Sequence, residues 1–200
     1  FDDGSALGSG VNPEAQIDLI AQAWAQLSGV APLAQRRQAM AAVKARLVDA
    51  EMGLIKLLDP PLQEAVPSAG YIQAYPPGVR ENGGQYSHAG VWALMAQAGL
   101  ATEDAGGEAA GADLVYRYFC HLSPAHRAAD HRQGAVYGIE PYVMAGDVYS
   151  QPPYAGRGGW SWYTGAAAWL HRAAIESMFG LTQSAQTLVF RPCLPTHWPR

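Results

Sequence analysis

The chain has 200 residues, of which 49% are hydrophobic, so it can bury one sizeable core but hardly two. Its formal net charge of −4 and the absence of any lysine and arginine cluster argue against a surface that binds nucleic acid. No run reaches the roughly 20 apolar residues that a membrane-spanning helix needs, and no basic-then-apolar leader opens the chain. The glycine-rich start without Met predicts a piece of a longer protein.

Residues 13–50 are predicted to form two helices joined by a short link, as an antiparallel hairpin. The first is expected over 13–29, where Pro13 suits the first turn and Gly29 suits the end. Its apolar side chains recur at the spacing of one helical face: Ile17, Ile20, Trp24 and Leu27. The second is expected over 32–50, with its own apolar face: Met40, Val43 and Leu47.

Three further segments are predicted in the middle of the chain. The apolar stretch 53–61 ends in two prolines and indicates a buried strand or an extended link. A helix is predicted over 87–100, with Ser87 as its N-cap. Its inner face would be Val91, Leu94, Met95 and Ala98. Another helix is predicted over 103–124, although its three glycines cost about 1 kcal/mol each relative to alanine; small residues can instead let helices approach closely.

The end of the chain is predicted to alternate strands and one helix. Residues 138–144 and 186–195 indicate strands, and the glycine- and proline-rich stretch 145–159 indicates a loop. The last helix is expected over 163–180. Its inner face would be Ala167, Leu170, Ala174 and Met178. The chain is thus predicted to be mainly α, with helical hairpins and a few short strands, and such hairpins stack or close into a ring.

Few familiar chemical sites can be identified. Cys120 and Cys193 lie far apart, in a predicted helix and a predicted strand, and two buried thiols are the simpler interpretation. No histidine, cysteine and glutamate spacing resembles a metal site, and no GxSxG serine motif occurs. No carboxylate pair for ordinary sugar hydrolysis stands out. The sequence therefore predicts no metal.

One loop, residues 80–88, concentrates polar groups of every kind: RENGGQYSH. A guanidinium, a carboxylate, two amides and a phenol combine donors and acceptors, which suits a neutral polyhydroxy ligand such as a sugar. The alternative is an ion pair between Arg80 and Glu81 on a turn that Asn82 stabilises locally. The residues alone leave both interpretations open.

A second glycine-rich loop leads into the last predicted helix, where Thr164 and Gly165 stand at the helix start. Free backbone N–H groups, a hydroxyl and the positive end of the helix dipole make an anion site there, unless Thr164 only caps the helix. His88 also lies near a helix start, where the dipole favours anions, and its alternative role is structural. Trp160 is the candidate for stacking on a sugar ring, whereas Trp169 is the candidate for the core.

The chain resembles the glycoside phosphorylases of glycoside hydrolase family 94 over residues 1–29, 70–98, 140–169 and 191–199. Within the family it is most similar to the C-terminal, phosphorylase-like region of NdvB-like cyclic β-1,2-glucan synthases. The resemblance implies a partial (α/α)6 barrel, a toroid of helical hairpins. It also implies inverting phosphorolysis of a β-glucoside to glucose 1-phosphate. Phosphate attacks the anomeric carbon in that reaction, so one carboxylic acid suffices to protonate the leaving oxygen.

The resemblance assigns roles to residues of both loops. The family's phosphate-binding positions are matched by His88, Thr164 and Gly165. The positions that contact the substrate sugar are matched by Arg80 and Glu81, and we expect Gln85 and Trp160 to join them. Inorganic phosphate is then a co-substrate, and no cofactor is implied.

Two departures from the family's pattern matter. The family's catalytic aspartate lies in a Trp-Asn-Asp segment, which this sequence lacks, so we expect the general acid upstream and no catalytic residue within the chain. The family often carries a phosphate-contacting glutamine where this sequence has Gly146 and Asp147. A carboxylate near phosphate is unfavourable, so Asp147 is expected to point away or to signal altered chemistry, with Arg157 as a candidate to offset its charge.

Residues 1–200 are accordingly predicted to be the C-terminal part of a single (α/α)6 catalytic barrel in a much larger protein. The expected partners are a β-glucan oligosaccharide, phosphate, the rest of the parent chain and, through exposed apolar surface, a second copy. The expected location is cytoplasmic, as the cytoplasmic domain of an inner-membrane glucan synthase. Two alternatives stay open: a noncatalytic carbohydrate-binding or length-controlling module of such a synthase, and a structural domain of helical hairpins.

Overall fold

Helices dominate the computed structural model, which describes residues 2–103 and 108–199. The helices are α1 (Leu19–Leu27), α2 (Leu33–Ala42), α3 (Tyr71–Ala74), α4 (Ser87–Glu103), α5 (Glu108–Leu122), α6 (Pro124–Arg127), α7 (His131–Tyr137) and α8 (Thr164–Arg172). Two of them continue as π-helical turns, α2 into Val43–Leu47 and α8 into Ala173–Met178. The mainly helical class predicted from the sequence is confirmed.

The strands are two to four residues long and pair antiparallel. The two-stranded pairs are β1 (Ile17–Asp18) with β4 (Leu58–Asp59), β2 (Val48–Asp49) with β3 (Leu54–Ile55), and β8 (Leu181–Ser184) with β9 (Thr187–Phe190). A small three-stranded sheet has the order β5–β6–β7, formed by Gln85–Tyr86, Asp147–Val148 and Gly158–Gly159. This sheet joins the two polar loops, which lie far apart in the sequence.

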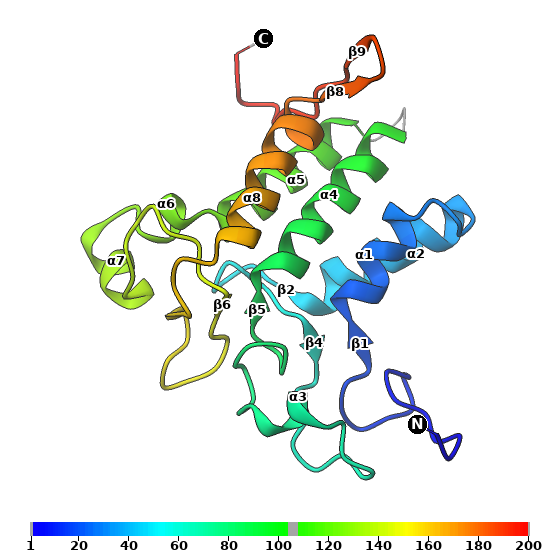
Figure 1. Ribbon diagram of the computed structural model, residues 1–200, viewed down its shortest axis with the longest axis vertical. Helices are drawn as coiled ribbons and strands as arrows, with labels where there is room; N and C mark the ends of the chain where they lie inside the picture. The colour runs from blue at the N-terminus through cyan, green and yellow to red at the C-terminus, as the bar shows by residue number, and fades with distance from the viewer. Residues whose placement is uncertain (1, 104–107, 200) are drawn as a thin grey trace.

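Helix α4 lies at the centre of the molecule and packs against α1, α5 and α8 (Figure 1). Helices α1, α4 and α8 all begin at their lower ends in the view, toward the part of the molecule where most of the irregular loops collect (Figure 1). These helices share one core, which includes Leu19, Ala23, Val91, Leu94, Val115, Tyr118 and Ala166. The shared core fixes the starts of α4 and α8 relative to each other, and both starts carry predicted site residues.

Small residues bring α4 and α5 close together, as the sequence predicts for its helical glycines. A Cβ atom added at Gly111 would lie 2.7 Å from the Cβ of Ala101, and one added at Gly90 would lie 2.5 Å from Cδ2 of Leu122. Real Cβ atoms do not approach so closely, so a side chain at Gly111 would push the helices apart, and one at Gly90 would displace the Leu122 side chain. The other two glycines of the predicted 103–124 helix, at positions 106 and 107, lie outside the described residues.

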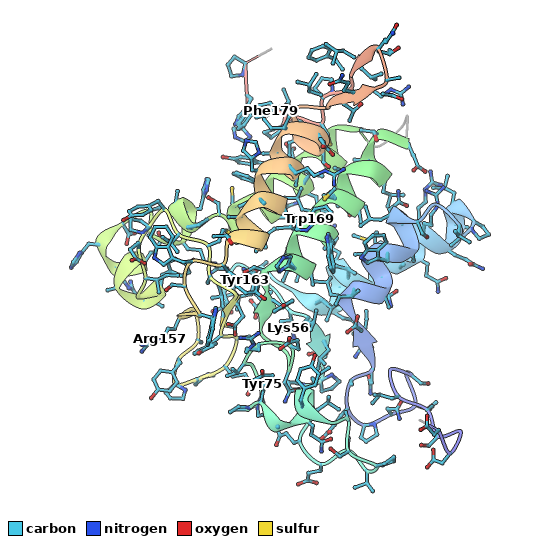
Figure 2. The ribbon with its side chains drawn as sticks, in the orientation of Figure 1. Lys56, Tyr75, Arg157, Tyr163, Trp169 and Phe179 are labelled. Atoms are coloured by element: carbon cyan, nitrogen blue, oxygen red, sulfur yellow. The ribbon has the colours of Figure 1, made fainter. Side chains whose placement is uncertain are left out.

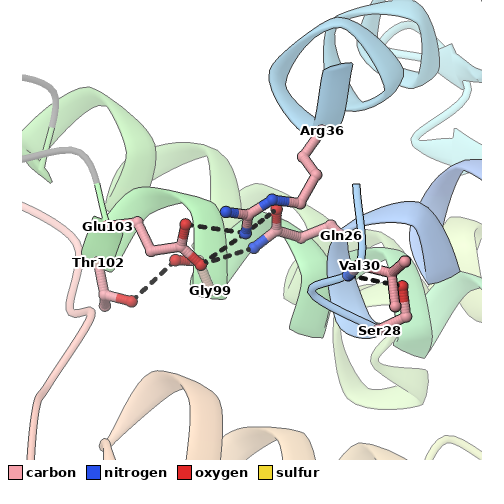
Figure 3. Close-up of polar contacts among 7 residues, drawn as sticks. All are labelled: Gln26, Ser28, Val30, Arg36, Gly99, Thr102 and Glu103. Carbon is pink, nitrogen blue, oxygen red and sulfur yellow. Dashed lines mark hydrogen bonds and ion pairs between the residues drawn. The ribbon is translucent and has the colours of Figure 1, made fainter. Parts of the chain in front are cut away.

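A polar network ties the far ends of α1, α2 and α4 together (Figure 3). Arg36 on α2 forms an ion pair with Glu103 on α4, with 2.9 Å between Nη1 and Oε2. Gln26 on α1 lies between them: it donates to Glu103 (3.1 Å) and accepts from Arg36 (3.2 Å). The end of α4 opposite the loops is therefore held by both neighbouring helices.

The structure corrects where two helices begin. Helix α1 starts at Leu19 and not at Pro13, because Ile17 and Asp18 pair with β4 and the Asp18 carboxylate caps the helix by accepting the N–H of Ala21. Its buried face is also rotated from the predicted one, and Trp24 is 45% exposed. Helix α4 includes Ser87 as its first residue, so Ser87 is not the N-cap; its hydroxyl donates to the carbonyl of Ala145 (2.6 Å).

Residues 138–144 do not form the predicted strand. The Tyr137 hydroxyl donates to the Val143 carbonyl (3.0 Å), and the Val143 N–H donates to the Glu140 carbonyl (3.1 Å), so the segment is folded into a turn. The nearby strand is β6, a few residues later. On the last helix the inner face is displaced by one position at Ala167, which is exposed whereas Ala166 is buried.

Other predictions are confirmed. The buried face of α2 and its π-helical turn contains Met40, Val43 and Leu47. Short strands lie within the stretch 53–61, and a strand lies within 186–195. In the part of the chain that the structure describes, no helix is long and apolar enough to cross a membrane.

Candidate functional site

The start of α8 leaves backbone donors open. Tyr163 is the N-cap residue, and its own N–H donates to the carbonyl of Met144 (2.9 Å). Thr164 and Gly165 are the first two helical residues and both are exposed. The first N–H groups of a helix have no partner within it, so these two amides can meet a ligand. Thr164 is therefore not the residue that caps the helix.

His88, on the first turn of α4, lies directly against this helix start. A Cβ atom added at Gly165 would be 3.0 Å from Nε2 of His88, so a side chain there would press on the imidazole. The ring also meets the Tyr163 ring edge to face, with 5.2 Å between centroids. The structure thus brings together the three predicted phosphate residues, His88, Thr164 and Gly165.

Burial sets the charge state of His88. The ring is half-buried, and this desolvation lowers the pKa of His88 below its usual value. Its Nδ1 atom is buried and, among the described residues, has no hydrogen-bond partner. The lowered pKa favours the neutral imidazole at neutral pH, and because Nδ1 is buried, a ligand beside Gly165 can meet the ring only at Nε2.

The predicted sugar-binding residues Arg80 and Glu81, called the sugar set below, lie on a turn that several contacts hold in place. Arg80 has a positive φ of +49°, and its N–H donates to Oδ2 of Asp147 (2.7 Å). Its Nε lies 3.4 Å from Oε2 of Glu81, and its guanidinium lies over the Tyr75 ring, 5.5 Å from the centroid. Both charged side chains remain partly exposed. The pair forms a fixed donor–acceptor surface.

Asp147 acts on this turn and not on the helix start. It is only 1% exposed and lies in β6, between Tyr86 of β5 and Gly159 of β7. Burial raises the pKa of Asp147, and the N–H of Arg80 opposes this effect. The carboxylate points at the Arg80 backbone, which agrees with the expectation that Asp147 points away from the phosphate. Arg80, and not Arg157, is its neighbouring cation, since the Arg157 guanidinium lies over the Tyr154 ring (5.9 Å).

A pair of tyrosines connects the two sets. The hydroxyls of Tyr86 and Tyr163 are 2.9 Å apart, and both rings contact His88. Burial and the bond to Tyr163 raise the pKa of Tyr86. Figure 2 shows Tyr163 at the base of α8, between Trp169 above it and Tyr75 below it. The tyrosine pair thus links the start of α8 to β5, the strand that follows the Arg80–Glu81 turn.

Two polar residues of the loop serve other purposes. Gln85 is buried: its Oε1 accepts the N–H of Ile55 (2.8 Å) and its amide donates to the His121 carbonyl (3.1 Å). The predicted contact of Gln85 with sugar is thus replaced by a structural role, because both ends of its amide are engaged inside the protein. Asn82 is also buried and bonds to the backbone of Leu62 and Tyr75.

The two tryptophans differ as the sequence predicts. Trp160 is 72% exposed, whereas Trp169 is half-buried and packs edge to face on Trp92, with 6.0 Å between centroids. Sequence reasoning did not choose Tyr163 as a site residue, although its place directly before the Thr-Gly pair was an available signal. A separate hollow of about 770 Å³ contains His121 and Arg127, and none of its lining residues belongs to either set. No group of three metal-ligating side chains occurs among the described residues.

Comparison with known proteins places the chain in a family. Residues 1–180 match the model of the Glycosyl hydrolase 94 superfamily, catalytic domain. The chain belongs to this family. The resemblance inferred from the sequence is thus confirmed, and the chain forms a part of the family's catalytic domain.

Several members of the family are similar over almost the whole chain. The cyclic β-(1,2)-glucan synthase NdvB of Rhizobium meliloti (strain 1021) is 45% identical over 199 residues, which are 100% of this chain and 7% of that protein. The solabiose phosphorylase of Paenibacillus borealis is 32% identical over 203 residues, 98% of this chain and 24% of that protein. The N,N'-diacetylchitobiose phosphorylase of Vibrio proteolyticus is 26% identical over 198 residues, which are 98% of this chain and 23% of that protein. The chain spans at most about a quarter of these relatives.

Proposed function

We propose that the chain supplies the phosphate site and part of the sugar site of a glycoside phosphorylase. The reaction would be inverting phosphorolysis of a β-glucoside, with β-1,2-linked glucan as the substrate and glucose 1-phosphate as the product. The observation that carries the proposal is the contact of His88 with Gly165 at the start of α8. Family membership and the activities named for the similar phosphorylases and glucan synthase support it.

The phosphate would be bound at the start of α8. The N–H groups of Thr164 and Gly165, the Thr164 hydroxyl and Nε2–H of His88 are donors, and the helix dipole favours an anion there. Because the neutral imidazole donates through Nε2, binding does not need a charged histidine. The Asp147 carboxylate, engaged by Arg80, is kept from competing for these donors.

The sugar would be bound by the neighbouring set. Arg80 and Glu81 offer a charged donor and a charged acceptor, whose hydrogen bonds to hydroxyls are stronger than those of neutral groups. Trp160 offers an exposed aromatic face. Since the tyrosine pair joins the two sets, a sugar held by Arg80 and Glu81 would present its anomeric carbon to the phosphate.

The chemistry needs one group from elsewhere in the parent protein. A phosphate oxygen attacks the anomeric carbon while the bond to the leaving oxygen breaks, and a carboxylic acid gives its proton to that oxygen. We place this acid in the rest of the catalytic domain, because the chain spans only 7% to 24% of its relatives. Helices α1, α4 and α8, which begin at one end, would be neighbouring helices of an (α/α)6 barrel completed by the rest.

The test combines the chain with the preceding part of its parent's catalytic domain. We expect glucose 1-phosphate from sophorose and phosphate only when both parts are present. Turnover by the chain alone would show that the acid lies within it. Sugar binding by the combined protein without phosphorolysis would favour the noncatalytic module instead.

Variants then test the phosphate residues. His88→Ala should weaken phosphate binding about tenfold, since one hydrogen bond to an anion is lost. The matched control is His171→Ala, which removes an exposed histidine from the same helix that carries Gly165. Phosphate titrations of the chain followed by NMR measure both. Equal affinities for the two variants would contradict the assignment of His88.

A further inference from the structure

A group of aromatic side chains beside the proposed sugar site is exposed and has no assigned role. Trp162 is 62% exposed and Tyr142 is 74% exposed, next to Trp160. The rings of Trp162 and Tyr142 meet edge to face, with 6.3 Å between centroids. Monomeric proteins rarely display such large apolar side chains together, and contiguous exposed apolar patches mark binding sites.

The backbone holds these tryptophans in a costly conformation. Trp160 and Trp162 have positive φ angles of +51° and +58°, which bulky residues rarely adopt. Such conformations are strained and persist where surrounding contacts enforce them, typically at functional sites. The contacts here are the Gly146 N–H, which donates to the Trp160 carbonyl (2.8 Å), and the Tyr163 N–H, which donates to Met144.

We propose that Trp162 and Tyr142 form a second sugar-binding face that takes additional glucose units of a β-linked glucan chain. Sugar rings have apolar C–H faces that pack flat on aromatic rings, and Tyr142 fixes the orientation of the Trp162 indole. Trp162 lies two residues before Thr164, so this face is continuous with the start of α8. The inference rests on the proposed function and names its substrate class as an oligomer longer than a disaccharide.

The composition of the segment favours a sugar over a protein as the occupant. Residues 150–165 contain no leucine, isoleucine, valine, methionine or phenylalanine. Its aromatic residues alternate mainly with glycine, serine and proline, so the exposed apolar surface consists of flat rings and not of aliphatic side chains. Sites for small ligands combine such faces with a few polar groups, and Arg80, Glu81 and Arg157 supply polar groups in the neighbouring loops.

The test compares two sugars on the 200-residue chain without phosphate, so that the chemistry of the proposed function does not enter. Binding of sophorose and of a linear β-1,2-linked gluco-oligosaccharide long enough to pass both tryptophans is measured by NMR titration. Trp162→Ala should weaken oligosaccharide binding about three- to tenfold, the range expected for one aromatic contact. It should change sophorose binding by less than about twofold.

Two further variants make the outcome decisive. Phe190→Ala removes an exposed ring from the β9 hairpin, at the end of the molecule opposite the loops, and should change neither affinity (Figure 1). Trp162→Gly should weaken oligosaccharide binding like Trp162→Ala without loss of folding stability, because glycine adopts a positive φ freely.

An equal loss for both sugars, or no loss for either, would overturn the proposal. It would also be overturned if Trp162→Ala left sugar binding intact but weakened association with the rest of the catalytic domain. Absence of phosphorolysis in the combined protein, with oligosaccharide binding still dependent on Trp162, would refute the proposed function and leave the second sugar-binding face supported.

Discussion

The two polar loops look alike in sequence but use their polar groups differently. In the loop 80–88, the amides of Asn82 and Gln85 are buried and bonded to backbone groups of other segments. At the start of α8, Thr164 and Gly165 are exposed. A high density of polar residues in a loop therefore does not measure its ligand-binding capacity. What counts is which groups remain available after the fold has used the others.

The difference has an energetic reason. Buried polar groups must be hydrogen-bonded, so a loop that packs under other loops uses its amides to satisfy their backbone groups. A helix start needs no such partners when it faces solvent or a ligand. Variants of the buried loop amides should therefore change stability, whereas variants at the exposed helix start should change binding.

The largest expected effect is on stability, from Asn82→Ala. This change leaves the N–H and carbonyl of Leu62 and the carbonyl of Tyr75 without their partner, in a buried environment. We expect a loss of about 2–4 kcal/mol in the free energy of unfolding, measured with urea.

The matched control for Asn82→Ala is Asn12→Ala. Asn12 also bonds to backbone groups of its own loop, those of Ser9 and Ala6, but solvent reaches these bonds. The control should cost less than about 1 kcal/mol. Similar losses for the two variants would show that burial of the amide is not the deciding factor.

Helix positions could be predicted from the sequence because helical periodicity is local. The buried face of α2 follows from apolar spacing alone, as Met40 illustrates, whereas α4 is buried nearly all round and has no single inner face. The start of α1 could not be predicted, because Ile17 and Asp18 pair with residues about 40 positions later. The turn at 138–144 depends on the Tyr137 hydroxyl, and no sequence pattern announces that bond.

The candidate site divides in the same way. Residue types with an obvious chemistry, such as His88 and the Thr-Gly pair at a helix start, could be chosen from the sequence. The fate of Gln85 could not, because its partners Ile55 and His121 come from separate segments. The tyrosine pair was missed for the same reason: Tyr86 and Tyr163 meet only through the fold.

The next largest effect should be on binding, from Gly165→Ala. The added methyl would lie 3.0 Å from Nε2 of His88 and displace the imidazole. We expect phosphate affinity to fall about tenfold, while stability stays equal or rises by up to about 1 kcal/mol, because alanine favours helix. Phosphate titration and thermal unfolding measure the two effects separately.

Gly134→Ala is the control for this prediction. Gly134 lies within α7, where the nearest atom to an added Cβ is 3.7 Å away, so the methyl fits. It should raise stability similarly and leave phosphate binding unchanged. A fall in phosphate affinity in this variant as well would indicate a general effect of helical alanines.

A smaller effect is expected from Tyr163→Phe, which removes one hydroxyl of the tyrosine pair. The loss of the 2.9 Å bond to Tyr86 should cost about 0.5–1.5 kcal/mol of stability. Tyr154→Phe, at an exposed tyrosine under Arg157, should cost nothing measurable. Urea unfolding of both variants checks this, and equal stabilities would mean that the pair does not hold the two sets together.

The smallest effect, and the one that depends on pH, is expected from Asp147→Asn, since the amide oxygen can still accept the Arg80 N–H. Burial raises the pKa of Asp147 above its ordinary 3.8, and Arg80 opposes the rise. Between 3.8 and the raised value the folded chain keeps a proton that the unfolded chain has lost. The unfolding free energy of the parent chain therefore falls as pH rises through this range.

Asparagine does not titrate, so the stability of Asp147→Asn relative to the parent chain should increase from acid to neutral pH. Asp113→Asn should show the opposite trend, because the N–H and hydroxyl of Thr196 hold the pKa of Asp113 below its ordinary value. The stability that this lowered pKa contributes is present at neutral pH and is lost as pH falls. Urea unfolding at several pH values measures both differences. Parallel trends in the two variants would mean that the pKa of Asp147 is not raised by burial, and that Asp147 is not a buried carboxylate held by Arg80.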